Sequence, residues 1–92
     1  MNMWKHSPDV VYRDLEGEAV ILDLASGTYF GLNEVGTRVW RMIDEGRDAA
    51  EIVDIVAAEY QADRGTIAQD VARLLDDLSA RRLIVTGGTE PV

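Results

Sequence analysis

The chain has 92 residues, of which 17 are acidic and 9 are basic, so its formal net charge is −8. This length suits one small domain, and 47% hydrophobic residues provide for a modest core. The lack of cysteine excludes disulfides and thiolate metal sites, and the single histidine, His6, excludes a histidine-rich metal centre. No apolar run approaches the roughly 20 residues that span a bilayer, and the first residues lack the apolar stretch of a signal peptide. A cytoplasmic location is therefore expected.

The acidic charge also bears on the partners. A nucleic-acid-binding protein needs basic side chains that displace counterions from phosphates, and this chain offers no basic footprint. We therefore expect neither nucleic acid nor membrane as a partner, and the field of the protein favours a cationic one. The alternative is that the acidity serves solubility alone.

The chain begins with polar residues and two short predicted strands. Residues 1–9 are expected to form a flexible arm, in which Trp4 either packs on the body or marks a contact. Val10–Asp14 and Glu18–Leu24 are rich in β-branched and aliphatic residues and are predicted to pair as strands. Glu16 and Gly17 supply the turn between them, because glycine tolerates a positive φ.

The second and third strands set the register of the predicted sheet. If residues 25–27 form a three-residue hairpin loop, Leu22 lies opposite Phe30, and Tyr29 lies on the other face. A slip by one residue would exchange the two faces. In the predicted register, the buried face contains Val20, Leu22, Leu24, Phe30 and Leu32.

The segment from Gly27 to Trp40 is predicted to change abruptly from strand to helix. Thr28, Tyr29 and Phe30 favour a strand, and Asn33 directly after them is a strong N-cap. A helix is expected from about Glu34 to Glu45. Its apolar stripe consists of Val35, Val39, Trp40, Met42 and Ile43. Gly46 is placed to end it in the left-handed conformation, and Gly36 in the first turn indicates close approach to a neighbouring element.

Two further helices are predicted after this one. Asp48 and Glu51 form an acidic variant of the capping box before a helix whose stripe is Ile52, Val53, Val56 and Tyr60. Asp63 is expected to cap a third helix from about Arg64 to Arg81. Its stripe is Ile67, Val71, Leu74, Leu75 and Leu78. Residues 83–85 are expected to pack back on the body, and residues 86–92 to form a disordered tail.

The sequence offers no grouping for catalysis, for a metal or for another cofactor. A nucleophile–base pair would need Ser or Thr near His6, the single histidine, which lies in the predicted flexible arm. Asp76 and Asp77 are adjacent in a helix, where neighbouring side chains point apart. Residues 27–31 lack the glycines and the lysine of a phosphate loop. We therefore expect a protein that is not an enzyme and that holds no cofactor.

The second and third helices, with the short turn between them, could form a helix-turn-helix. A recognition helix presents Arg, Lys, Asn or Gln to base edges. The third helix instead presents a net acidic set, namely Gln69, Asp70, Arg73, Asp76 and Asp77. A winged-helix DNA-binding regulator is therefore kept as the alternative function.

The third strand is the other candidate for function. In a three-stranded meander the first and third strands are edges, whose unpaired backbone groups can accept another strand. Residues 28–31 carry neither lysine nor proline to protect this edge. An extended peptide could therefore add to it by β-augmentation, unless the third helix or the N-terminal arm covers the edge.

The segment SGTYFGLNEVGTRVW, residues 26–40, resembles the PqqD-like proteins, the RiPP leader-peptide recognition elements. The resemblance extends from about Val10 to Ile84 and is most similar to the stand-alone leader-binding proteins of lasso-peptide biosynthesis. It implies an α+β fold, a three-stranded antiparallel sheet followed by three helices, in a winged helix-turn-helix-like domain over residues 10–85. Glu-Val-Gly after Asn33 differs from the pyrroloquinoline quinone members, which favours the lasso-peptide group or another RiPP pathway.

The resemblance also implies a function and a site. Such a protein binds the leader of a ribosomally synthesised precursor peptide and presents it to a maturation enzyme, such as a leader peptidase. The leader lies in a groove between the third strand and the third helix. The strand side of the groove is Thr28, Tyr29, Phe30, Gly31 and Leu32, and the helix side is Asp70, Arg73, Leu74, Asp77 and Leu78. The acidic residues in this groove suit a leader that bears Lys or Arg.

Overall fold

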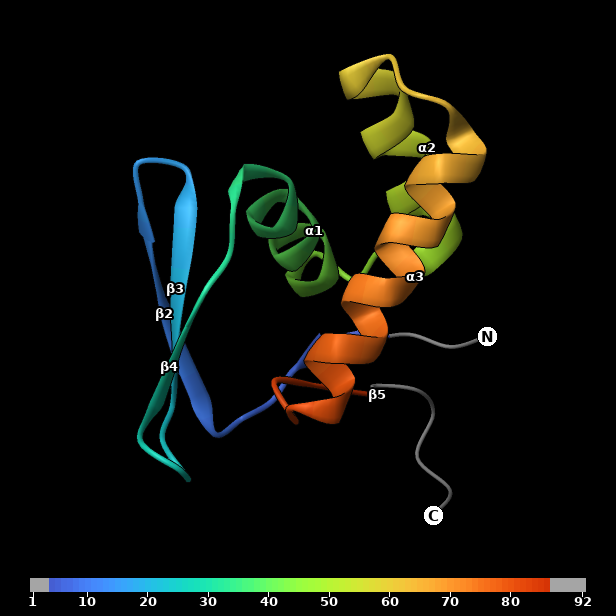
Figure 1. The fold of residues 1–92 in the computed structure, drawn as a ribbon. Helices are drawn as coiled ribbons and strands as arrows, with labels where there is room; N and C mark the ends of the chain where they lie inside the picture. Colours follow the sequence, from blue (N-terminus) through green and yellow to red (C-terminus); the bar gives the residue numbers. More distant parts are fainter. Residues whose placement is uncertain (1–3, 87–92) are drawn as a thin grey trace.

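The structure is a computed structural model, and its description extends over residues 4–86. Its sheet-forming and helical elements form an α+β fold, as the resemblance implies. They are β1 (Trp4–His6), β2 (Val10–Leu15), β3 (Glu18–Asp23), β4 (Thr28–Gly31), α1 (Glu34–Asp44), α2 (Ala49–Tyr60), α3 (Arg64–Ala80) and β5 (Ile84–Thr86). The antiparallel sheet β2-β3-β4 stands beside α1, and α2 and α3 lie on the far side of α1 (Figure 1). None of the helices within residues 4–86 has the length and apolar character that crossing a bilayer requires.

The register between β3 and β4 differs by one residue from the predicted one. Ile21 lies opposite Phe30, and Leu22 lies opposite Tyr29. With this register, the connecting loop has four residues, 24–27. The Asp23 carboxylate organises the loop, because it accepts from the backbone N–H of Ala25 at 3.0 Å and from the Ser26 hydroxyl at 2.9 Å. This turn begins one residue earlier than a three-residue loop would.

The shifted register exchanges the faces of β3. Ala19 and Ile21 are completely buried, whereas the side chain of Leu24 is 57% exposed. The predicted burial of Val20, Leu22 and Leu24 on one face is therefore wrong. Phe30 and Leu32 do pack against the core, as predicted. On β3 and β4, the inner face of the sheet thus consists of Ala19, Ile21, Phe30 and Leu32.

The helices begin where their caps were predicted. The Asn33 side chain accepts from the Gly36 N–H at 2.8 Å, and Asp63 accepts from the Thr66 N–H at 2.9 Å. Asp48 and Glu51 form the capping box before α2. The buried stripes of the three helices converge on one core, although Tyr60, predicted to belong to it, is 41% exposed. Helical core residues include Val39, Trp40, Met42, Ile43, Ile52, Val53, Val56, Val71, Leu75 and Leu78.

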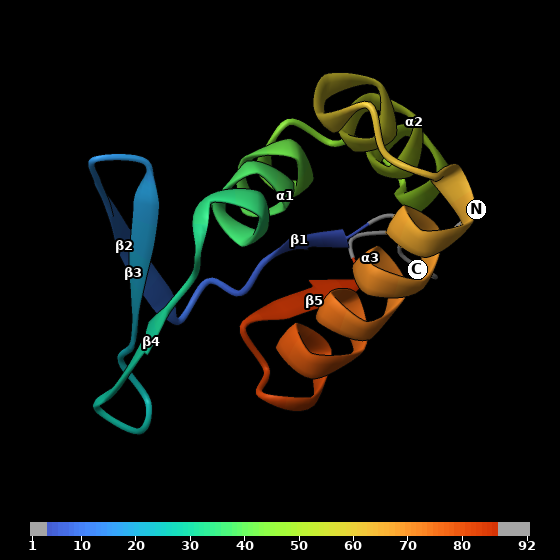
Figure 2. The ribbon, with the colours of Figure 1, turned by 45° about the horizontal axis from the view of Figure 1, so that its top comes forward.

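The N-terminal segment differs from the predicted flexible arm. Trp4–His6 forms a strand that pairs with Ile84–Thr86, and the Ser7 N–H donates to the Leu83 carbonyl at 2.9 Å. Figure 2 shows these two strands beside α1 and α3. Leu83 and Ile84 are buried, and Trp4 packs against the same core. Buried backbone N–H and C=O groups need partners within the protein, and the pairing of these two segments provides them. Residues 1–3 and 87–92, the rest of the predicted arm and tail, lie outside the described residues.

His6 is therefore part of the packed body. Its Nε2 lies 2.8 Å from the carbonyl oxygen of Trp40, and its ring stacks on the Trp40 ring with centroids 3.7 Å apart. The Tyr12 ring meets the Trp40 ring edge-on at 5.6 Å. Through this aromatic cluster, β1 and β2 pack against α1.

Candidate functional site

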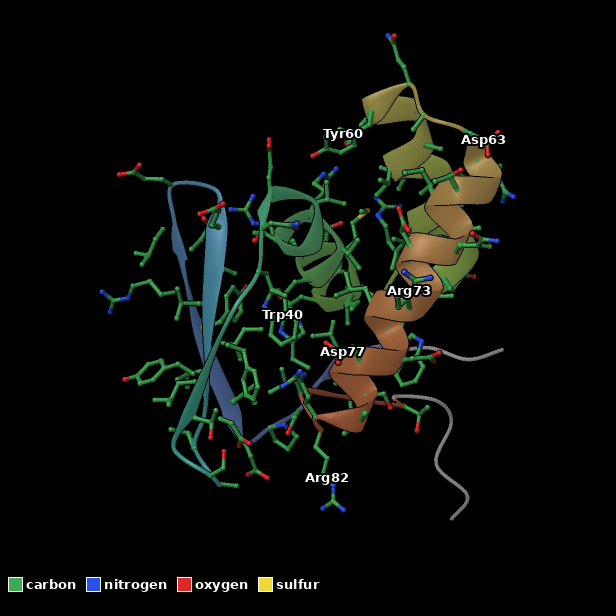
Figure 3. The ribbon with its side chains drawn as sticks, viewed as in Figure 1. Trp40, Tyr60, Asp63, Arg73, Asp77 and Arg82 are labelled. Atoms are coloured by element: carbon green, nitrogen blue, oxygen red, sulfur yellow. The ribbon has the colours of Figure 1, made fainter. Side chains whose placement is uncertain are left out.

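A cleft of about 510 Å³ lies where the end of β4 meets the helices. Most of its lining side chains are apolar, and α3 adds two exposed carboxylates, those of Asp70 and Asp77. Figure 3 shows Arg73 and Asp77 on neighbouring turns of α3, and Trp40 between α1 and the sheet. The lining residues are Gly31, Leu32, Asn33, Val35, Gly36, Val39, Val56, Ile67, Asp70, Val71, Leu74 and Asp77.

Strand β4 borders this cleft with a free edge. The Leu32 N–H donates to the Ala19 carbonyl at 2.9 Å, so this opposing pair belongs to the hydrogen-bonded class. Because the two classes alternate along an antiparallel ladder, the backbone groups of Phe30 also face β3, and those of Tyr29 and Gly31 face outward. On its other side, β3 bonds to β2 through the opposite set of residues, as the 2.9 Å bond from Leu24 N–H to the Asp9 carbonyl shows.

The free edge has no partner among residues 4–86. The N-terminal segment, which could have covered it, pairs with β5 instead. The N–H and C=O groups of Tyr29 and Gly31 are therefore available to an incoming strand.

Thr37 holds the corner between β4 and α1 in place. Its Oγ1 accepts from the buried Ala19 N–H at 2.8 Å and lies 3.3 Å from the Leu32 carbonyl, to which the hydroxyl donates. The hydroxyl thus stands between two backbone groups that would otherwise face each other in the ladder. Gly36 is packed as predicted, since a Cβ there would lie 3.2 Å from Asn33 Oδ1 and 3.4 Å from Leu32 Cβ. The corner is therefore rigid, and it fixes the direction of the free edge.

Arg81 connects the end of α3 to the same strand. Its guanidinium carbon lies 5.1 Å from the centre of the Phe30 ring, and its Nε lies 3.2 Å from both carboxylate oxygens of Asp77. A guanidinium at this distance from a ring makes a cation–π contact. These contacts hold α3 beside β4 at one end of the cleft.

The structure brings five of the ten predicted site residues together in the cleft: Gly31, Leu32, Asp70, Leu74 and Asp77. Arg73 lies next to them, in a shallow hollow of about 400 Å³ that it shares with Asp70, Leu74 and Asp77.

The other four predicted residues lie outside the cleft. Leu78 is only 2% exposed and supports α3 from the core. Tyr29 is 68% exposed on the face of the sheet that points away from the core, opposite Leu22. Phe30 is half-buried under Arg81, and Thr28 is exposed at the far end of β4.

Seven lining residues were missed by sequence reasoning: Asn33, Val35, Gly36, Val39, Val56, Ile67 and Val71. Val35 could have been predicted from the sequence, because it is an apolar residue in the first turn after the N-cap Asn33, next to the end of the strand. In the structure it is 36% exposed. Val56 could not be found in this way, since its place in the cleft depends on how α2 packs against α1 and α3.

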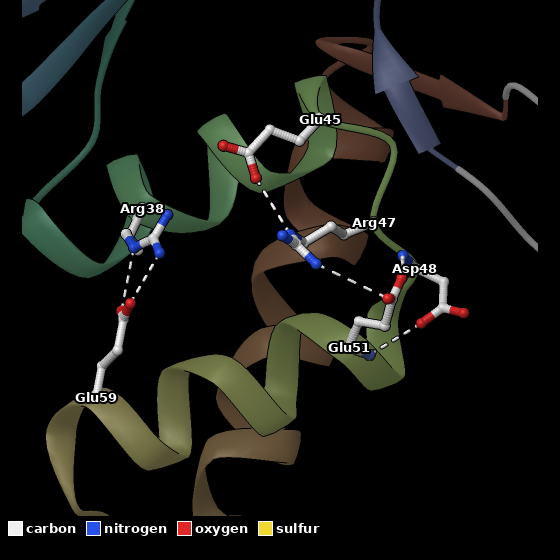
Figure 4. Close-up of polar contacts among 6 residues, drawn as sticks. All are labelled: Arg38, Glu45, Arg47, Asp48, Glu51 and Glu59. Carbon is white, nitrogen blue, oxygen red and sulfur yellow. Dashed lines mark hydrogen bonds and ion pairs between the residues drawn. The ribbon is translucent and has the colours of Figure 1, made fainter.

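The resolved shifts in pKa lie away from the cleft, in an ion pair between α1 and α2. Two hydrogen bonds, of 3.1 and 2.7 Å, join the Arg38 guanidinium to the Glu59 carboxylate (Figure 4). They lower the pKa of Glu59 below its ordinary value and raise that of Arg38. Within residues 4–86, no three His, Cys, Asp or Glu side chains gather as a metal site would require.

Comparison with known proteins identifies the family of this fold. The sequence matches the family described as Coenzyme PQQ synthesis protein D (PqqD) over residues 18–84. The chain belongs to the PqqD family. Two relatives from Rhodopseudomonas palustris, strains TIE-1 and ATCC BAA-98 / CGA009, are named "PqqA binding protein" and are each 38% identical over 47 residues. The match covers 51% of this PqqD-family chain but only 46% of each relative, about half of their length.

Two solved structures share the fold of this PqqD-family chain. One is titled "TbiB1 in Complex with the TbiA(beta) Leader Peptide"; it is 40% identical, with a TM-score of 0.83, and the match covers 95% of this chain and 99% of that one. The other, "Lasso peptide synthetase B1 complexed with the leader peptide", is 22% identical, also with a TM-score of 0.83, over 89% and 96% of the two chains. At that identity the second likeness shows the fold alone. The resemblance identified from the sequence is thus confirmed.

Proposed function

We propose that this PqqD-family protein binds the leader segment of a ribosomally synthesised precursor peptide along β4 and presents it to a maturation enzyme, such as a leader peptidase, in the cytoplasm, where such precursors are made. The observation that carries the proposal is the free edge of β4, with the outward backbone groups of Tyr29 and Gly31 beside an apolar cleft. The relatives support it, since one is titled as a complex with a leader peptide and two are named for binding PqqA. In this role the protein is a carrier and not an enzyme.

In the proposed complex, the backbone and the side chains near β4 have different roles. A strand added to β4 forms hydrogen bonds with Tyr29 and Gly31, and these bonds give affinity without reading sequence. Its alternate side chains, those opposite Phe30 and Leu32, point toward the helices. Apolar leader residues two positions apart would therefore meet Leu32 and Leu74 in the cleft, and a cationic residue would meet Asp70 or Asp77. Arg73 borders the path, and Leu78 supports the wall from behind.

The alternative function, DNA binding by a winged helix, has no observation in its favour. The exposed side of α3 carries Asp70, Asp76 and Asp77, and the chain has a net charge of −8. Such a surface repels phosphates. The relatives found by comparison are named for peptides and not for nucleic acids.

Gly31 provides the experiment, because its N–H faces the proposed peptide. Gly31→Pro removes this donor, and the fold should tolerate it because proline is accepted on an edge strand whose N–H faces solvent. Gly31→Ala is the matched control, since a Cβ at this position meets no atom within 4 Å and the N–H is kept. In an amide-shift titration with the synthetic leader of a candidate precursor that the wild type binds, the alanine variant should bind like the wild type and the proline variant should not bind.

The same titration tests the position of the peptide. Shifts are expected at residues 28–32 and along the cleft side of α3. Shifts confined to β2, or to helical surfaces away from the cleft, would contradict the assignment even if the peptide binds. A Gly31→Pro variant that is folded by circular dichroism and binds normally would also contradict it.

A further inference from the structure

The second face of the three-stranded sheet is apolar and exposed. Residues on this outer face alternate with the buried ones along each strand. We define the outer face by Val11, Arg13, Leu15, Val20, Leu22 and Tyr29, which line a shallow hollow of about 450 Å³ together with Tyr12. Val11 is 51% exposed and Leu15 53%. In both ribbon views no described element covers this side of the sheet (Figures 1 and 2).

Such a face is unusual for a sheet that needs only one packed side. Antiparallel sheets of this kind normally carry polar residues toward solvent. Here the inner face supplies the packed side of β3, where Ala19 and Ile21 are completely buried. A contiguous exposed apolar patch of this kind marks an interaction surface.

The charges around the outer face indicate what it binds. Arg13 stands opposite Val20 in the middle of this face and makes no ion pair with any residue from 4 to 86. Glu16 and Glu18 lie at the turn that joins β2 to β3. A second copy would bring together two chains of charge −8, which repel each other. The face instead fits a different protein that has an apolar patch, a carboxylate for Arg13 and basic residues toward its rim.

We propose that the outer face is the docking surface for the enzyme that processes the precursor. This inference rests on the proposed function. A leader strand added to β4 places every second side chain on this same face, next to Tyr29 and Gly31. An enzyme seated there would touch the carrier and the leader together. It would therefore bind the loaded carrier more tightly than the empty one, and by linkage it would tighten leader binding by the same factor.

Substitutions on β2 separate the two functions, because β2 is the sheet edge far from β4. We expect the double variant Val11→Glu/Leu15→Glu to bind a labelled synthetic leader within twofold of the wild type, by fluorescence anisotropy. In cells that make the mature peptide, the same variant should lower the yield at least tenfold by mass spectrometry. The matched control is Ala50→Glu/Ala58→Glu, which adds the same charge at exposed positions of α2 and should leave both quantities unchanged.

Arg13→Glu provides a second test, because it reverses one exposed charge without removing an apolar contact. It should also lower the yield of mature peptide while leader binding is kept. Normal leader binding shows that each variant is folded. A normal yield from both the double variant and Arg13→Glu would overturn the inference. Failure of the wild type to bind the leader would instead remove the proposed function.

A photo-crosslinking amino acid in place of Leu15 identifies, in the producing cells, the protein that binds the outer face. The expected product joins this protein to the enzyme whose deletion leaves the precursor unprocessed. A crosslink to a second copy would overturn the inference. So would a wild-type dimer in sedimentation that the double variant converts to a monomer.

Discussion

Thr37 is the residue on which the geometry of the free edge depends most directly. Its hydroxyl satisfies the buried Ala19 N–H and the Leu32 carbonyl at once. Thr37→Val keeps the shape but leaves both backbone groups unpaired, so the free energy of unfolding should fall by about 1–3 kcal/mol. Thr37→Ser, the control, keeps the hydroxyl and should cost less. Urea denaturation measures both, and a valine variant as stable as the wild type would show that water replaces the hydroxyl.

Trp40 carries the largest single packing contribution in α1. It is completely buried, as the sequence predicted, and His6 and Tyr12 pack on its ring. Trp40→Ala should lower the free energy of unfolding by about 3–5 kcal/mol, which is much of the stability of a small domain. Trp40→Phe retains part of the contact and should cost clearly less. Equal denaturation midpoints for the alanine variant and the wild type would contradict the packing described here.

At the scale of elements, one ion pair between α1 and α2 makes stability depend on pH. Because Arg38 lowers the pKa of Glu59 in the folded protein, the pair stabilises above the ordinary value of 4.5 and is lost as the pH falls below it. Glu59→Gln should therefore lower the thermal midpoint slightly at pH 7 and have no effect at low pH, since the pair is exposed. The control is Glu18→Gln, whose carboxylate makes no ion pair within residues 4–86. A Glu59→Gln effect that grows on acidification would contradict this sign.

The elements themselves could be predicted where a local signal decides them. Asn33, Asp48 and Asp63 start their helices as expected, because each cap is satisfied within three residues. The register of β3 and β4 was missed, because it depends on how the Asp23 side chain organises the loop. The strand Trp4–His6 was missed for a different reason: its partner, β5, lies about 80 residues away, and no local pattern reports such a pairing.

The cleft could be predicted only in part for the same physical reason. The resemblance located the strand and the helix that border it, and the helical stripe located Leu74. Val35 and Val56 line the cleft because of the angles at which the helices pack, and the periodicity of apolar residues in the sequence does not predict those angles. Leu78 shows the converse error, because residues on one stripe of α3 divide between the core and the cleft.

At the scale of the whole molecule, the chain is a sheet and a helical layer that meet along one rigid corner. The cleft lies on the helical side of the sheet, at the end of β4, and the outer face lies on the other side of the sheet. A leader strand at β4 would extend both sides at once. On the proposed function, a bound leader would therefore contact the helices on one side of the sheet and a larger partner on the other.

The net charge of −8 would act on the proposed leader binding in two ways, through the field of the whole molecule and through the carboxylates that line the cleft. Asp70 and Asp76 distinguish them, because both are exposed on α3 but only Asp70 lines the cleft. For a leader that bears Lys or Arg, Asp70→Asn should weaken binding by about 0.2–1 kcal/mol, or about 1.4- to 5-fold. It should also flatten the dependence of affinity on salt. Asp76→Asn changes the net charge equally and should have the smaller effect on both. Anisotropy titrations at several salt concentrations measure these quantities, and equal effects of the two variants would show that the overall field, rather than the cleft, attracts the leader.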